Sequence, residues 1–119
     1  MKRILVTGGR HFANPTEVHR TLHPYGRCVI IEGGMSGADH LAGAYADANG
    51  LPHIKHPARW KELGPRAGPV RNAEMLDEWK PDLVIALPGG TGTANTVSQA
   101  KKRGIEVKDL RIKVIPFPG

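Results

Sequence analysis

The chain has one cysteine and no long apolar run, and each shortage excludes a class of protein. With Cys28 alone, neither an internal disulfide nor a cysteine-cluster metal site can form. No apolar stretch approaches the roughly 20 residues that a membrane-spanning helix needs, and no charged-then-apolar leader marks secretion. We therefore expect a cytoplasmic protein without a membrane partner.

Histidine is better represented, with six residues, but their spacing is not that of a metal site. His53 and His56 do not share one strand face, and neither a His-Glu-x-x-His motif nor a cysteine partner is present. The sequence predicts no bound metal and no resident cofactor.

Positive charge is in excess, with a net charge of +6 at pH 7, which allows an anionic partner. Part of this charge has a structural explanation, because Lys101, Lys102 and Arg103 close a predicted helix whose carboxyl end favours cations. Aromatic residues make up only 5% of the chain and do not alternate with basic ones, as they do in single-strand binders. A nucleic-acid-binding module is therefore an alternative rather than the leading interpretation.

Short β-branched runs alternate with helical patterns along the whole chain, which predicts one α/β domain over residues 1–119. The expected strands cover residues 4–6, 29–31, 53–56, 83–87 and 112–115, and the expected helices cover 14–25, 36–49, 67–79 and 93–103. Asn14 and Ser36 are expected to cap the first two helices through capping boxes with Glu17 and Asp39. Residues 57–65 are read as a loop. The fold class is a doubly wound, Rossmann-like parallel sheet with three α/β/α layers.

Three glycine turns follow apolar strands, and they are the main functional signal. The candidate ligand-binding residues in them are Gly8, Gly9 and Arg10; Gly33, Gly34, Ser36 and Asp39; and Pro88, Gly89, Gly90, Thr91, Gly92, Thr93 and Asn95. The carboxyl edge of an open α/β sheet is where ligands bind, and a helix start behind a glycine turn presents free N–H groups to an anion. The third turn is not a Walker loop, since no lysine follows its last glycine. The turns predict a phosphate or nucleotide site.

Arg71 and Asn72 are the other candidate binding residues, because they lie in the first turn of the helix expected over 67–79. A cation in that position opposes the helix dipole, and an anionic ligand would explain it. Asp39 serves either as a helix cap or as a partner for a sugar hydroxyl, and the two roles are compatible.

Taken together, the motifs resemble the YspA-type (cpYpsA-related) SLOG domains. The motifs that carry the resemblance are Gly8 to Phe12, Gly33 to Asp39, Pro57 to Trp60, Ala67 to Asn72 and Pro88 to Asn95. The superfamily also contains the LOG phosphoribohydrolases, the DprA/Smf proteins and molybdenum-cofactor carriers. The resemblance implies a Rossmann-like domain that binds nucleotides or nucleotide-derived ligands, often as a homo-oligomer such as a homodimer.

The resemblance leaves the reaction open. LOG enzymes cleave the N-glycosidic bond of a nucleoside monophosphate with an arginine, which Arg71 resembles, and a glutamate, where this chain has Thr96. Because glycosidic cleavage needs a carboxylate, the leading interpretation is a binder or sensor of ADP-ribose, a nucleoside monophosphate or a similar molecule. The alternative is a LOG-like phosphoribohydrolase, with Arg71, Asp39 and Glu32 as candidate catalytic residues.

Overall fold

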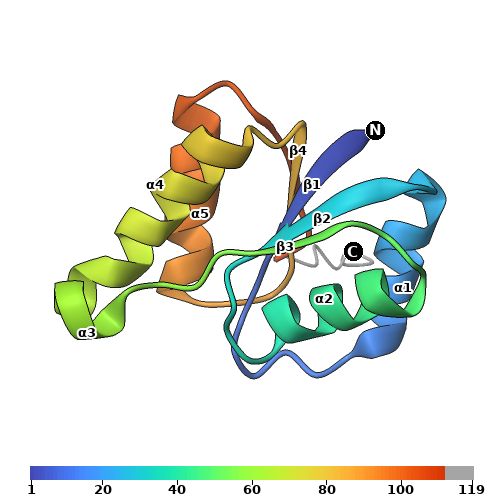
Figure 1. Ribbon diagram of the computed structural model, residues 1–119, viewed down its shortest axis with the longest axis horizontal. Coiled ribbons are helices and arrows are strands. Elements are labelled where there is room, and N and C mark those ends of the chain that lie inside the picture. The colour runs from blue at the N-terminus through green and yellow to red at the C-terminus, as the bar shows by residue number, and fades with distance from the viewer. Residues whose placement is uncertain (112–119) are drawn as a thin grey trace, which may run out of the picture.

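A computed structural model describes residues 1–111, which form a five-stranded parallel sheet with helices on both faces (Figure 1). The strands are β1 (Lys2–Thr7), β2 (Cys28–Glu32), β3 (His53–Lys55), β4 (Leu83–Ala86) and β5 (Glu106–Asp109). Their order in the sheet is β3-β2-β1-β4-β5, so the direction of winding reverses between β1 and β4. Ligands of doubly wound sheets bind outside the strand ends at such a reversal.

The helices cover the sheet in two pairs, with α1 and α2 on one face and α4 and α5 on the other (Figure 1). Their bounds are α1 (Pro15–Leu22), α2 (Ala38–Ala48), α3 (Trp60–Leu63), α4 (Ala67–Trp79) and α5 (Thr91–Lys102), with 3-10 turns η1 (His23–Tyr25) and η2 (Gly64–Arg66). This arrangement confirms the predicted doubly wound α/β fold.

Successive strand residues pack into different halves of the core. Ile4 and Val6 join the core under α1 and α2, whereas Leu5 between them joins the core under α4 and α5. Because side chains alternate across a strand, one unbroken apolar run supplies both halves. That is why these strands show no polar alternation.

The first predicted cap is confirmed and the second is wrong. Asn14 accepts a hydrogen bond from the Glu17 N–H at 3.0 Å, and Pro15 opens α1. At α2 the N-cap is Gly37, whose φ of 77° turns the chain, and the Ser36 hydroxyl donates instead to the Arg10 carbonyl at 3.2 Å. Contact with the β1 loop therefore replaces a local cap.

Two other segments differ from expectation. The final strand predicted over 112–115 lies outside the described residues, while β5, at the sheet edge beside β4, was missed. Strand β5 was missed because its sequence is Glu-Val-Lys-Asp, which is not an apolar run. An edge strand does not need to be apolar on both faces. Residues 57–65, expected as a loop, contain the short helix α3. Within residues 1–111, no helix has both the length and the apolar character needed to cross a membrane.

Candidate functional site

The loops after β1 and β4 interlock at the reversal of the sheet. The Gly9 N–H donates to the Pro88 carbonyl at 2.8 Å. A Cβ at Gly89 would lie 2.6 Å from the Gly9 nitrogen and 2.3 Å from the Thr93 hydroxyl oxygen. Only glycine therefore lets the two loops meet at this separation.

The loop after β2 joins the same edge of the sheet. The Ala38 N–H donates to the Gly9 carbonyl at 3.1 Å, and a Cβ at Gly37 would lie 2.2 Å from that carbonyl oxygen. The prediction that all three glycine turns lie together at the carboxyl ends of the strands is confirmed.

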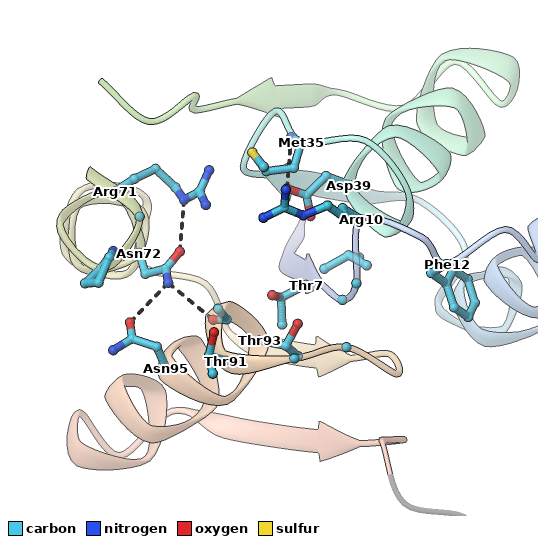
Figure 2. A pocket seen from close by; sticks show the side chains of 18 of the residues that line it. Thr7, Arg10, Phe12, Met35, Asp39, Arg71, Asn72, Thr91, Thr93 and Asn95 are labelled. Carbon is cyan, nitrogen blue, oxygen red and sulfur yellow. Dashed lines mark hydrogen bonds between the residues drawn. The ribbon is translucent and has the colours of Figure 1, made fainter. Parts of the chain in front are cut away.

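These loops border a cavity of about 890 Å³, into which side chains from several elements point (Figure 2). The predicted binding residues that line it are Gly8, Gly9, Arg10, Asp39, Arg71, Asn72, Pro88, Gly89, Gly90, Thr91, Gly92, Thr93 and Asn95. Gly33, Gly34, Ser36 and Glu32 are not among its lining residues. The second turn thus borders the cavity only through Met35 and Asp39.

The amino end of α5 opens into the cavity. Its N-cap, Gly90, has no side chain to accept a bond from the first-turn N–H groups, and Thr91, Gly92 and Thr93 all line the cavity. Unpaired N–H groups and the positive end of the helix dipole make such a terminus favourable for an anion. The arrangement suits a phosphate group.

Arg71, in α4, is a buried cation in the cavity wall, with 8% of its surface exposed. Its guanidinium donates to the Gly33 carbonyl and, through Nε, to Asn72 Oδ1 at 2.9 Å. Burial lowers the pKa of Arg71, and the charges of Asp39 and Glu32 oppose that shift. The arginine therefore stabilises the β2 loop in addition to facing the cavity.

Asp39 is the acidic residue of the cavity wall (Figure 2). Burial raises its pKa from 3.8 to about 6, although the hydrogen bond from the Met35 N–H (3.2 Å) and the charge of Arg71 partly offset this rise. A carboxyl group with this pKa exchanges protons close to neutral pH, which is suitable for acid–base chemistry or for binding a hydroxyl group.

The raised pKa of Asp39 predicts a pH-dependent stability difference. Above pH 6 the folded protein holds an ionised, desolvated Asp39 carboxylate, which lowers the free energy of unfolding. Between about pH 6 and 3.8 the folded state binds the proton more tightly than the unfolded state does, so the destabilisation disappears on acidification. We expect Asp39→Asn to raise the free energy of unfolding by up to about 3 kcal/mol at pH 7.5, from 1.36 kcal/mol per pKa unit. The gain should vanish near pH 4. Urea denaturation of both proteins across this range measures it, and a gain independent of pH would contradict it.

Glu32, which does not line the cavity, belongs to a hydrogen-bonded network with one histidine, His53. Its side chain is 1% exposed; one oxygen accepts from the Gly34 N–H at 2.5 Å, and the other lies 2.6 Å from His53 Nε2. The second ring nitrogen, Nδ1, lies 3.1 Å from Asp47 Oδ1. Both Glu32 oxygens are thus engaged: one holds the loop that Arg71 contacts, and the other links β2 to His53 in β3.

Amide side chains link α4 to α5 beside the cavity. Asn72 Nδ2 donates to Asn95 Oδ1 at 3.1 Å and to the Gly92 carbonyl at 3.4 Å (Figure 2). Thr96, where LOG-like enzymes carry a glutamate, is buried and donates its hydroxyl to the Gly92 carbonyl at 3.2 Å. The two Asn72 bonds therefore fix the amino end of α5 relative to α4, whereas the Thr96 bond lies within α5.

Sequence reasoning missed ten lining residues, most of them apolar. Thr7, His11, Phe12, Met35, Trp60, Pro65, Gly68, Pro69 and Met75 also line the cavity, as does Val6. Trp60 and Pro69 lie inside motifs that carry the family resemblance, and their place in those motifs was the sequence signal that could have marked them as site residues. Within the described residues, no three His, Cys, Asp or Glu side chains gather as metal ligands do.

Comparison with known proteins decides the family. The model of the YspA, cpYpsA-related SLOG family matches residues 2–63. The chain belongs to this family. The Gene 61 protein of Mycobacterium phage D29 is 36% identical to it over 123 residues, covering 90% of this chain and 94% of the phage protein.

Solved structures share the fold of this SLOG domain. The Moco carrier protein from Chlamydomonas reinhardtii is 19% identical with a TM-score of 0.65, covering 96% of this chain and 79% of that one. UDP-GlcNAc 2-epimerase from Neisseria meningitidis is 17% identical with a TM-score of 0.57, and the match covers 92% of this chain but only 31% of the epimerase. At these identities the likeness concerns the Rossmann-like fold.

Proposed function

We propose that this SLOG domain binds a nucleotide or nucleotide-derived ligand, such as ADP-ribose or a nucleoside monophosphate, and acts as a sensor or carrier of it. The observation that carries the proposal is the convergence of the open α5 amino end and two arginines, Arg10 and Arg71, on one cavity of about 890 Å³. This volume is within the range of small-molecule sites.

Each part of the ligand has a candidate partner. The phosphate would accept hydrogen bonds from the N–H groups around Gly90 to Thr93, with Arg10 and Arg71 supplying positive charge. The sugar or base would contact Asp39 or Asn95, which face the same space (Figure 2). The nucleotide-type ligands that the family resemblance implies and the Moco carrier protein among the solved structures of this fold are in keeping with a binding role.

Replacing Arg10 should weaken binding without affecting the fold. Arg10 is exposed at the cavity, and a charge-assisted hydrogen bond contributes about 1.5–3 kcal/mol, so Arg10→Ala should lower affinity about tenfold or more. Titration calorimetry with AMP, ADP-ribose, NAD and single-stranded DNA measures the effect. Arg27→Ala is the matched control, because Arg27 is also exposed but precedes β2 at the other edge of the sheet.

The panel separates the candidate functions. Equal losses for Arg10→Ala and Arg27→Ala would indicate non-specific charge attraction, and preferential binding of the DNA would favour the nucleic-acid alternative. Loss of affinity for the small nucleotides in Arg10→Ala alone supports the proposed site.

A LOG-like phosphoribohydrolase is the second candidate, and the specific observation in its favour is Asp39, a cavity carboxyl with a pKa of about 6. The buried, hydrogen-bonded Thr96 in place of a glutamate speaks for binding alone. Free adenine released from AMP by the unmodified protein, and lost in Asp39→Asn, would establish the hydrolase.

We also propose a homo-oligomer, on the family resemblance, and light scattering would test it.

A further inference from the structure

Trp60 is an exposed aromatic side chain at the cavity. It is 47% exposed, and among the described residues only Met1 is another large hydrophobic residue that is exposed. Unlike Met1, Trp60 also lines the cavity. An indole left open at a cavity wall presents apolar area that a planar ligand could cover.

The indole packs against the first turn of α4. Gly68, in the first turn of α4, leaves room for the ring: a Cβ there would lie 3.3 Å from the outer ring carbon. The preceding residue, Arg59, pairs with Glu74 of α4 at 2.9 Å and anchors the start of α3. Figure 1 shows α3 beyond the amino end of α4, at the lower left. One edge of the ring thus packs on α4, which restricts the ring before a ligand binds and reduces the entropic cost of stacking.

The cavity combines two kinds of lining. One part of the lining is the glycine turn before α5, with Gly89, Gly90 and Thr91, which suits a phosphate group. The other part is apolar and comes from Trp60 in α3, Pro65 in η2 and Pro69 in α4. A nucleotide has the matching division, with an anionic phosphate and a flat base. Base-on-aromatic stacking is tolerant of base identity, because every base has a π-face.

We propose that Trp60 is the stacking platform for the base of the bound nucleotide, so that the site selects ligands with an aromatic base over sugar phosphates. This inference rests on the proposed nucleotide-binding function. Trp60 would determine how strongly the base is preferred, while the phosphate is held at α5.

Calorimetry with two probes tests the platform. AMP and ribose 5-phosphate share the sugar and phosphate and differ in the base. We expect Trp60→Ala to weaken AMP binding about tenfold or more and to change ribose 5-phosphate binding less than twofold, while Trp60→Phe retains most of the AMP affinity. Trp79→Phe is the matched control, because Trp79 donates its N–H to His56 at 3.0 Å and is not a lining residue; both affinities should stay unchanged.

Fluorescence gives a second measurement that keeps the native Trp60. In the Trp79→Phe protein Trp60 is the sole tryptophan, so AMP should change its emission and ribose 5-phosphate should not. Binding of AMP without any change in this emission would overturn the platform, and so would equal losses for both probes in a folded Trp60→Ala protein. Failure of the unmodified protein to bind either probe would instead overturn the proposed function itself.

Discussion

Gly37→Ala should lower the free energy of unfolding by about 4 kcal/mol. The φ of 77° and ψ of −126° at Gly37 are accessible mainly to glycine, and forcing another residue into such a region costs about 1–3 kcal/mol. The new methyl group would also meet the backbone carbonyl oxygen of Gly9 at 2.2 Å, and overpacking adds about 1–3 kcal/mol. Because that neighbour is backbone, the loop after β1 would have to move. Urea denaturation measures the loss.

Gly50→Ala is the matched control for backbone strain. Gly50 has a φ of 65°, but a Cβ there would have no atom within 4 Å. A single residue in a left-handed conformation costs about 1–2 kcal/mol, so Gly50→Ala should be clearly milder than Gly37→Ala. Equal losses in the two variants would show that conformational strain, and not contact with the β1 loop, explains the glycine at 37.

His53→Ala should lower the free energy of unfolding by about 3 kcal/mol. It would remove the 2.6 Å contact from the Glu32 carboxylate, which is 1% exposed and would be left with the Gly34 N–H alone. Breaking a buried ionic or charged hydrogen-bonded pair by removing one partner costs about 3–5 kcal/mol, and the 19% exposure of His53 places the effect at the lower end. Thermal and urea unfolding at pH 7 measure the change.

Asp47 provides the control for this network, because it contacts the same imidazole from the other side at 3.1 Å. Its side chain is 70% exposed, and exposed pairs contribute about 0–1 kcal/mol, so Asp47→Ala should have little effect. If the two variants lost similar stability, the Glu32 contact would have no special importance. His53→Ala should also weaken the proposed nucleotide binding, since Glu32 holds the loop whose Gly33 carbonyl accepts from Arg71.

The architecture and the edge that carries the site could be predicted from local sequence. Apolar runs such as residues 83–87 indicate strands buried on both faces, and the glycine that follows each run indicates a tight turn. Since consecutive βαβ units are right-handed and parallel, their carboxyl ends must share one edge of the sheet. The glycine turns therefore had to lie at the same edge of the sheet, and the strand order, with β1 between β2 and β4, places them next to one another.

Only the tertiary structure decided what each candidate side chain does there. Glu32 ends β2, and Asp39 lies in the first turn of the helix that follows. Asp39 lines the cavity, whereas Glu32 does not line it and contacts His53 instead. The burial of Arg71 and the placement of Trp60 over Gly68 likewise depend on residues that are distant in the sequence or lie in another element. Strand and turn formation follow from neighbouring residues, whereas desolvation, hydrogen-bond partners and access to the cavity depend on which distant segments pack together. For that reason the sequence determined the fold and the edge of the sheet, and the packing determined the chemistry of the site.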